Sequence, residues 1–99
     1  MFKAIILLKR KNGLGFEEFK SHWINHHADL VKQLPGIRRA IFNFHTGEGE
    51  IDAVSELWFD NEQDFHDAYA SDIGQKVAQD SLSRVSRRER YFLEEFEVV

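Results

Sequence analysis

The chain has 99 residues, a length that fits one domain, 1–99, and leaves no room for a second. Hydrophobic residues make up 42% and charged residues 30%, the proportions of an ordinary globular protein. A net charge of −4 disfavours nucleic acid and anionic membranes as partners, and the lack of cysteine excludes disulfide and thiol chemistry. The N-terminal apolar run is too short to span a bilayer and lacks a cleavage site, so we expect a cytoplasmic protein.

The first predicted elements are a strand and a long amphipathic helix. Residues 2–10 are apolar on both faces at their centre, which predicts a strand that is covered on both sides. Residues Gly15 to Gly36 place their large apolar side chains, among them Phe19 and Trp23, on one stripe of a helical wheel. Such a stripe is typical of a helix that lies on a core.

Two further strands follow, joined by a short connection. Residues 37–46 and 51–59 are rich in aromatic and aliphatic side chains that alternate along a strand. The glycine-rich residues 47–50 between them predict a hairpin, which makes the two strands antiparallel.

The last part of the chain predicts helix, a gap and a final strand. One of the pair Asp60–Asn61 caps a helix, and one of the pair Ser71–Asp72 restarts a shorter helix, which Gly74 weakens. The polar residues 80–87 predict no clear element. Residues 89–98 predict the last strand.

This order, β-α-β-β-α-β, is that of the ferredoxin-like sandwich, an α+β fold in which two helices cover one face of a four-stranded antiparallel sheet. In the first strand Ile5 and Leu7 lie on one face, and Ala4, Ile6 and Leu8 lie on the other. Either choice of covered face therefore leaves apolar side chains open to solvent. Because large exposed apolar patches are rare on monomers, we expect a homodimer joined through its sheets.

Three motifs give the chain a resemblance to a known family. Residues 19–30 carry the pattern F-x-x-x-W-x-x-x-H-A-x-L, residues 52–60 read D-A-V-S-E-L-W-F-D, and an acid follows at Asp80. In this order the motifs resemble the EthD family, named for ethyl tert-butyl ether degradation. The resemblance implies a dimeric α/β barrel, in which two sheets pack face to face. Two residues depart from the family pattern: Asp29, where proline is usual, and His22, where tyrosine is usual.

His27 is the leading candidate for a chemical role. Its imidazole titrates near neutral pH and can serve as a general base or acid without a cofactor. Beside Trp23 and an apolar sheet, desolvation should lower the pKa of His27 and leave the ring neutral at neutral pH. From the wheel alone, the alternative is a histidine at the edge of the core that is bonded to backbone. The resemblance favours the chemical role, because the motif histidine of the family falls on His27.

Asp80 is the candidate partner of His27, through the same resemblance. A carboxylate that accepts a hydrogen bond from one ring nitrogen fixes the tautomer and raises the basicity of the other nitrogen. The alternative for Asp80 is a solvated acid at the end of a helix.

His22 and His26 have the i, i+4 spacing of two metal ligands on one helix. The glutamate of an H-E-x-x-H motif is missing, and the sequence offers no third ligand at a usual spacing. Both histidines fall on the flank of the wheel, so we expect surface histidines, no metal site and no cofactor.

Six residues are candidates for the lining of a substrate pocket because their side chains are aromatic or polar: Phe19, Trp23, Asn43, His45, Trp58 and Tyr69. Aromatic side chains of this kind are more often core than pocket wall. The two polar candidates also suit a dimer surface.

The sequence therefore predicts a small EthD-like protein with a pocket for a hydrophobic or aromatic metabolite. If the protein is catalytic, the resemblance implies cofactor-free proton transfer (isomerisation, dehydration or lactone rearrangement) with His27 as base or acid. Two alternatives stay open. One is a non-catalytic module that binds a ligand or supports a degradative oxygenase, and the other is a cofactor-free or haem-linked monooxygenase on the same barrel.

Overall fold

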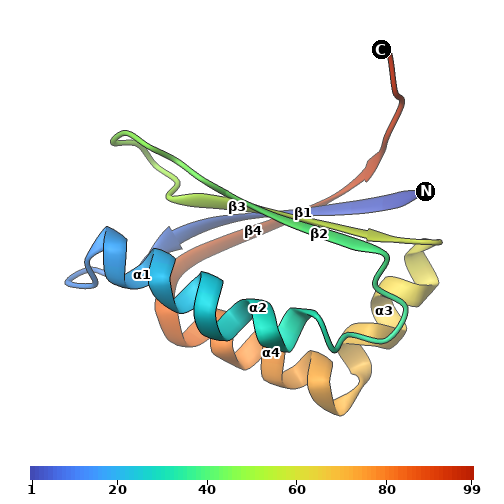
Figure 1. Ribbon diagram of the computed structural model, residues 1–99, viewed down its shortest axis with the longest axis horizontal. Coiled ribbons are helices and arrows are strands. Elements are labelled where there is room, and N and C mark those ends of the chain that lie inside the picture. The colour runs from blue at the N-terminus through green and yellow to red at the C-terminus, as the bar shows by residue number, and fades with distance from the viewer.

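A computed structural model describes all residues, 1–99, and shows one four-stranded antiparallel sheet with every helix on a single face (Figure 1). The strands lie in the order β2-β3-β1-β4, so β1 and β3 are central and β2 and β4 are edges. The elements in chain order are β1 (Phe2–Arg10), α1 (Phe16–His22), η1 (Trp23–His27), α2 (Ala28–Val31), β2 (Arg39–Phe44), β3 (Ala53–Phe59), α3 (Glu62–Ala70), α4 (Asp72–Arg84) and β4 (Val85–Glu94). The predicted α+β, ferredoxin-like arrangement is confirmed.

The register of the sheet decides which side chains of the central strands face the helices. Ile6 of β1 pairs with Ser55 of β3, and both residues are buried. Ile5 and Glu56 form the next pair along, and because side chains alternate along a strand they point the other way. The sheet therefore has an inner face, which the helices cover, and an outer face, which no helix covers.

The core lies between the inner face and the helices and is rich in aromatic rings. Its largest fully buried side chains come from both layers: Trp23, Phe19, Phe59, Phe65, Leu8 and Leu57. Phe65 of α3 meets Phe59 of β3 edge-on, with 5.5 Å between the ring centroids. Aromatic pairs favour such geometry because the positive edge of one ring faces the negative face of the other.

The first helix differs from the continuous helix predicted over Gly15 to Gly36. It is α-helical in α1, changes to a π-helix in η1 and returns to an α-helix in α2. In η1 the backbone N–H of Ala28 donates to the carbonyl of Trp23, five residues earlier, which is the hydrogen bond of a π-helix. Turns then carry the chain to β2, which is shorter at both ends than the predicted strand 37–46.

The second helical region is longer than the sequence predicted. Asn61 caps α3 and Ser71 caps α4, each through a side chain that accepts a hydrogen bond from a backbone N–H of the first turn. Helix α4 then continues to Arg84, through residues for which the sequence predicted no element. Gly74 is required in this helix, because a Cβ there would collide with the carbonyl of Ala68.

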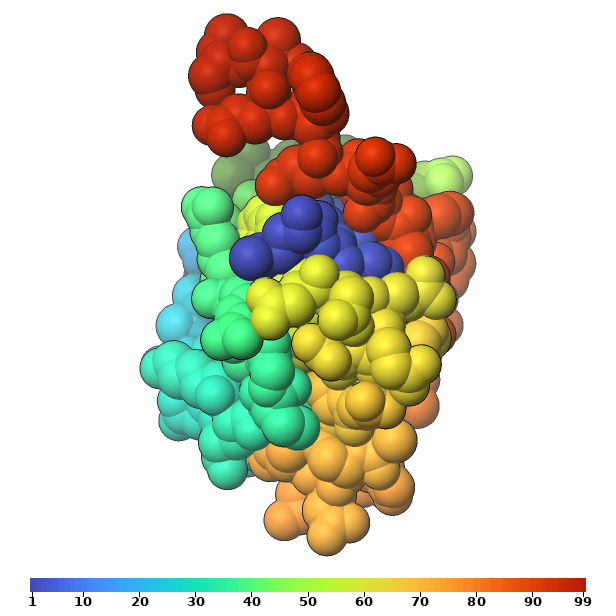
Figure 2. All heavy atoms as spheres, turned by 90° about the vertical axis from the view of Figure 1, so that its right-hand side faces the viewer, coloured from blue at the N-terminus to red at the C-terminus, as the bar shows by residue number.

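The last strand begins and ends earlier than the predicted range of 89–98. β4 runs from Val85 to Glu94 because it pairs with β1 along the whole length of that strand. The carboxylate of Glu95 is still bonded to Lys3 and Trp58. The end of the chain then projects from the body of the molecule (Figure 2), and Phe96 and Val98 are exposed. None of the helices has the length and apolar character needed to cross a bilayer.

Candidate functional site

The π-helical turn places two histidines, His22 and His27, on the face of the first helix that contacts Asp80. Hydrogen bonds in a π-helix link residues five apart and so place them on one face, whereas in an α-helix residues five apart point in different directions. His22 and His27 are five residues apart, and a ring nitrogen of each is hydrogen-bonded to Asp80 of α4. Turns of this kind are found frequently at functional sites.

His27, which is buried, and Asp80, which is half-buried, form a hydrogen-bonded pair. The Nδ1 atom of His27 lies 2.8 Å from Oδ2 of Asp80. Because an ionised carboxylate only accepts hydrogen bonds, Nδ1 carries the proton and donates it. The side chain of His27 is 6% exposed, and Trp23 stacks on its ring with 4.0 Å between centroids. This tautomer leaves the lone pair of the ring on Nε2.

Burial and hydrogen bonding have opposite effects on the two members of the pair. Burial lowers the pKa of His27 below its ordinary value of 6.5, as the sequence predicted, and the hydrogen bond to Asp80 offsets only part of this shift. Burial by itself raises the pKa of Asp80, but the hydrogen bonds from His27 and His22 outweigh it and hold that pKa below 3.8. At neutral pH the pair is a neutral imidazole beside a carboxylate, which is the resting state of a general base.

His27 lines a small cavity between the inner face and the helices. The cavity measures about 20 Å³, room for about one water molecule, and Trp23, Phe42 and Tyr69 also line it. The Nε1 atom of Trp23 is buried and has no hydrogen-bond partner. Buried donors without a partner are rare in proteins, so a ligand that accepts a hydrogen bond from Nε1 would remove an unfavourable state. Burial raises the pKa of Tyr69 from its ordinary value of 10.0 to about 12, so its hydroxyl stays protonated well above neutral pH.

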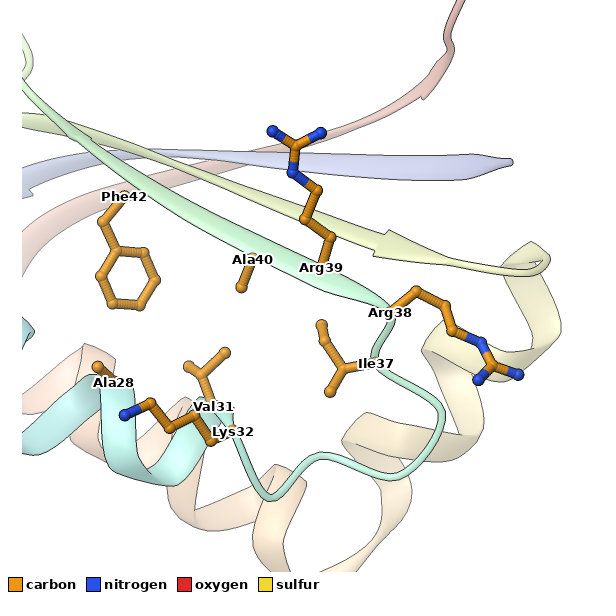
Figure 3. Close-up of a pocket in the computed structure, with 8 residues that line it drawn as sticks. All are labelled: Ala28, Val31, Lys32, Ile37, Arg38, Arg39, Ala40 and Phe42. Atoms are coloured by element: carbon orange, nitrogen blue, oxygen red, sulfur yellow. The ribbon is translucent and has the colours of Figure 1, made fainter.

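A larger cleft lies beside the cavity, between α2 and the edge strand β2. Its volume is about 360 Å³, within the usual range for small-molecule sites. Figure 3 shows Ala40 and Phe42 of β2 pointing toward Val31 of α2, while Arg38 and Arg39 extend away from the space between them. Val31 and Phe42 line both the cleft and the cavity, so the two spaces adjoin.

Three of the predicted pocket residues lie away from His27. Trp58 and Asn43 are on the outer face, where Asn43 donates a hydrogen bond to the carboxylate of Glu56. His45 follows β2 in the hairpin loop, and its ring is bonded to the backbone of that loop. The structure thus separates these three from the cavity, contrary to the prediction of one shared pocket. For Asn43 and Trp58 the physical reason is the alternation of side chains, which sends every second residue of β2 and β3 to the outer face. His45 is separated because β2 ends before it.

The other candidates divide between core and cavity. Phe19 is fully buried and packs on Trp23, with 4.9 Å between ring centroids, so it supports a wall of the cavity without lining it. Tyr69 and Trp23 both line the cavity. His22, predicted to be a surface residue, belongs to the site, because its Nε2 lies 2.9 Å from Asp80 and its side chain is only 16% exposed. A wheel drawn for an α-helix misses His22, since the π turn is what places it on the face of the acid.

The fold also brings a potential third ligand next to His22 and His26, which the sequence spacing did not offer. Asp80 lies next to both His22 and His26, and one potential ligand atom from each residue lies within 4.8 Å of the other two. The reason for expecting no metal at these histidines, a missing third ligand, therefore does not hold.

Comparison with known proteins agrees with the fold. The sequence matches the family model of the EthD domain over residues 11–84. Among solved structures, the chain is similar to an EthD family protein of Bacillus halodurans, with 23% identity and a TM-score of 0.86 over 97% of this chain and 99% of that chain. None of the curated proteins is similar enough in sequence to be matched.

Two further structures share the fold at lower identity. A dimeric protein of unknown function and ferredoxin-like fold from Bacteroides fragilis has 17% identity and a TM-score of 0.74, with 95% of each chain covered. SnoaB, a cofactor-independent oxygenase from Streptomyces nogalater, has 14% identity and a TM-score of 0.76, with 99% of this chain and 95% of that chain covered. Likeness at these identities is a likeness of fold.

Proposed function

Because the chain belongs to the EthD family, we propose that it binds a small hydrophobic or aromatic molecule between α2 and β2. His27 would then move a proton from one position of this ligand to another. The observation that carries the proposal is the geometry of one ring. Nδ1 of His27 is held by Asp80, while the same side chain lines the cavity. Asp80 acts through His27 and is therefore a positioning residue, and the reaction needs no cofactor.

The lining of the cleft supports a ligand that is mostly apolar. Five of its 8 lining residues are hydrophobic, and the arginines at its edge extend away from it. The cavity beside His27 is too small for a metabolite, so the body of the ligand would occupy the cleft. Phe42 stands between the two spaces, with its ring centroid 5.9 Å from that of His27. The side chain of Phe42 would turn aside to admit the reacting end of the ligand.

The chemistry open to this arrangement begins with proton removal. Nε2 of His27 takes a proton from an acidic C–H or O–H group, and the electron pair stays on the ligand as an anion. The unpartnered Nε1–H of Trp23 is available to donate to the oxygen on which the negative charge develops. Return of the proton to another carbon completes an isomerisation. Loss of hydroxide from the anion completes a dehydration, in which the proton and hydroxide leave as water.

Deuterium exchange at carbon tests the proposal without knowledge of the natural substrate. β-Tetralone, a bicyclic aromatic ketone with acidic C–H bonds, is incubated with the protein in D₂O and its deuteration is followed by NMR. We expect catalysed exchange that His27→Gln slows by about 10²–10⁴-fold, the usual contribution of a general base. His45→Ala, in the hairpin loop, is the matched histidine control and should not change the rate. Equal catalysis by the His27→Gln protein would contradict the proposal.

The same experiment separates the alternatives. A protein that binds β-tetralone without catalysing exchange would have the non-catalytic, accessory role. The likeness of fold to a cofactor-independent oxygenase favours one other reaction, in which the anion formed by His27 reacts with O₂. Oxygen consumption with an oxidisable aromatic substrate measures that reaction. A shift of the Soret band on titration with haem tests the haem-linked version.

We also propose that two copies of the chain associate through their outer faces. Ile5 and Leu7 of β1, Ile41 of β2 and Val54 of β3 form a half-buried aliphatic centre on this face. Two structures of similar fold are described as dimeric. A two-fold partner laid on this centre would remove it from water, which is the usual remedy for such a surface.

A further inference from the structure

A second group of side chains converges on Asp80, on the side that faces solvent. His22 and His26 come from successive turns of the first helix, with 4.9 Å between their ring centroids, and Asp80 comes from α4. Their potential ligand atoms lie within 4.8 Å of one another. Imidazole nitrogen and carboxylate oxygen are common ligands of divalent transition metals.

The spacing of the ligand atoms suits a single ion. Oδ1 of Asp80 lies 2.9 Å from Nε2 of His22 and 3.5 Å from Nε2 of His26. Two atoms that are each about 2.1 Å from one metal ion lie roughly 3.0–3.4 Å apart when the angle at the ion is about 90–110°. Both distances in the structure are close to this range. The ligand atoms of His22 and His26 lie within 4.8 Å of each other, so rotation of the exposed His26 side chain would adjust that third distance to one ion.

The hydrogen bond between Asp80 and His27 leaves the required oxygen available. A carboxylate has about four lone-pair positions on its two oxygens. Oδ2 accepts the hydrogen bond from Nδ1 of His27, whereas Oδ1 is the atom closest to both His22 and His26. Carboxylates that bind metals are usually held by a hydrogen bond of this kind, which orients the ligand. His27 therefore supports a metal at Oδ1 instead of competing with it.

We propose that His22, His26 and Asp80 form a binding site for one divalent transition-metal ion, with Zn²⁺ as the representative ion. On binding, His22 gives up its hydrogen bond to Asp80 and carries its proton on Nδ1, because a metal ligand must offer a free lone pair. The side chain of His26 is 60% exposed, so an ion reaches the site from solvent and water fills its remaining positions. The site does not depend on the proposed proton transfer, although both use Asp80.

Calorimetric titration of Zn²⁺ alone into metal-free, untagged protein tests the site. We expect one equivalent to bind, with an affinity at least about tenfold lower in His26→Ala, because loss of even an outer partner of a ligand costs about 10–100-fold. His26 is exposed, so its removal leaves the fold intact. His66→Ala removes an exposed histidine of α3 that is paired with Glu62 instead, and this control should bind Zn²⁺ like the wild type.

Two further readouts separate coordination from loose association. Co²⁺ in place of Zn²⁺ should give the visible absorption of a coordinated ion, and the band should be missing in His26→Ala. Zn²⁺ should raise the unfolding temperature of the wild type, because it binds the folded chain in preference to the unfolded one. Equal Zn²⁺ affinity of the wild type and His26→Ala, or no saturable binding to the wild type, would overturn the proposal.

Discussion

The inner and outer faces of the sheet are built from the same strands, yet they differ in what they contact. The inner face meets the helices, and its side chains form the core and part of the cavity beside His27. The outer face carries half-buried aliphatic side chains bordered by ion pairs such as that of Lys3 with Glu56. Each side has one tryptophan: Trp23 stacks on His27, and Trp58 lies under the cation of Lys3. A shift of one residue along a strand therefore decides whether a side chain points to the inner face, where the candidate site lies, or to the outer face.

The largest effect should come from a charge placed on the inner face. Ile6 is 8% exposed and belongs to the core, so Ile6→Glu buries a carboxylate without a partner, at a cost of several kcal/mol. Because small proteins are stable by only about 5–15 kcal/mol, we expect a chain that does not fold. Circular dichroism and thermal unfolding measure this outcome.

Ile5→Glu, one residue away, is the matched substitution on the outer face. It should keep the fold and weaken the proposed dimer, because Ile5 points away from the helices. Sedimentation velocity compares its association with that of the wild type. A well-folded Ile6→Glu protein, or an Ile5→Glu protein that associates as strongly as the wild type, would reverse the assignment of the two faces.

Asp80→Asn should have the next largest effect. The substitution removes the charge that accepts hydrogen bonds from His27 and His22 and should destabilise the protein by about 1–3 kcal/mol. It should also slow deuterium exchange of β-tetralone, because an amide no longer enforces the tautomer of His27 with its lone pair on Nε2. Urea unfolding measures the first effect and NMR the second. Exchange at the wild-type rate would show that Asp80 has a structural role only, as a hydrogen-bonded link between α4 and the first helix.

The pH dependence of stability should show the lowered pKa of His27. In the unfolded chain the pKa of this histidine returns toward 6.5. As the pH decreases through 6.5, the unfolded state therefore binds more protons than the folded state, and the protein becomes less stable. Asp80 acts in the same direction at lower pH, because its pKa in the folded state is below 3.8. Urea midpoints of metal-free protein above and below pH 6.5 measure the slope. A His27→Gln protein with an equally steep loss would contradict this origin.

The smallest effect should come from the outer-face residue that the sequence placed in the pocket. Asn43 is exposed, and its amide bonds to Glu56 and to the backbone of Val54. Asn43→Ala should therefore change stability by about 0.5 kcal/mol or less, as is usual for surface substitutions. Calorimetry should find the affinity for β-tetralone unchanged. A clear loss of affinity would extend the ligand site to the outer face.

The fold could be predicted because its signals are local. The first strand was predicted over residues 2–10 and is observed as Phe2–Arg10. Its central apolar run indicates the strand without knowledge of any distant contact. The predicted range of the last strand was displaced by four residues from the observed one. The position of β4 is set by its pairing with β1, a contact between distant parts of the chain that the local sequence does not show. Which face of β1 meets the helices was also undetermined, because Ile5 and Ile6 are equally apolar.

The site was predictable only in part. The motif resemblance led to His27 and Asp80, and the structure brings them together. The role of His22 could not be found, because a wheel for a regular α-helix places His22 and His27 on different faces, whereas the π turn between them brings both onto the face of Asp80. Trp58 was predicted to line the pocket because its side chain is aromatic. An aromatic side chain does not indicate to which face of the sheet it points, so this prediction was wrong about its position.

The indole N–H signals of the two tryptophans give the most direct test of the claim that the ligand site lies on the inner side of the sheet. The chain has 2 Trp, so a proton–nitrogen correlation spectrum contains two indole signals, which Trp58→Phe assigns. On titration with β-tetralone, the signal of Trp23 should move, because its buried N–H has no partner and gains one. The signal of Trp58 should stay in place, because its N–H already donates to Glu95 on the outer face. Movement of the Trp58 signal with that of Trp23 unchanged would contradict the account.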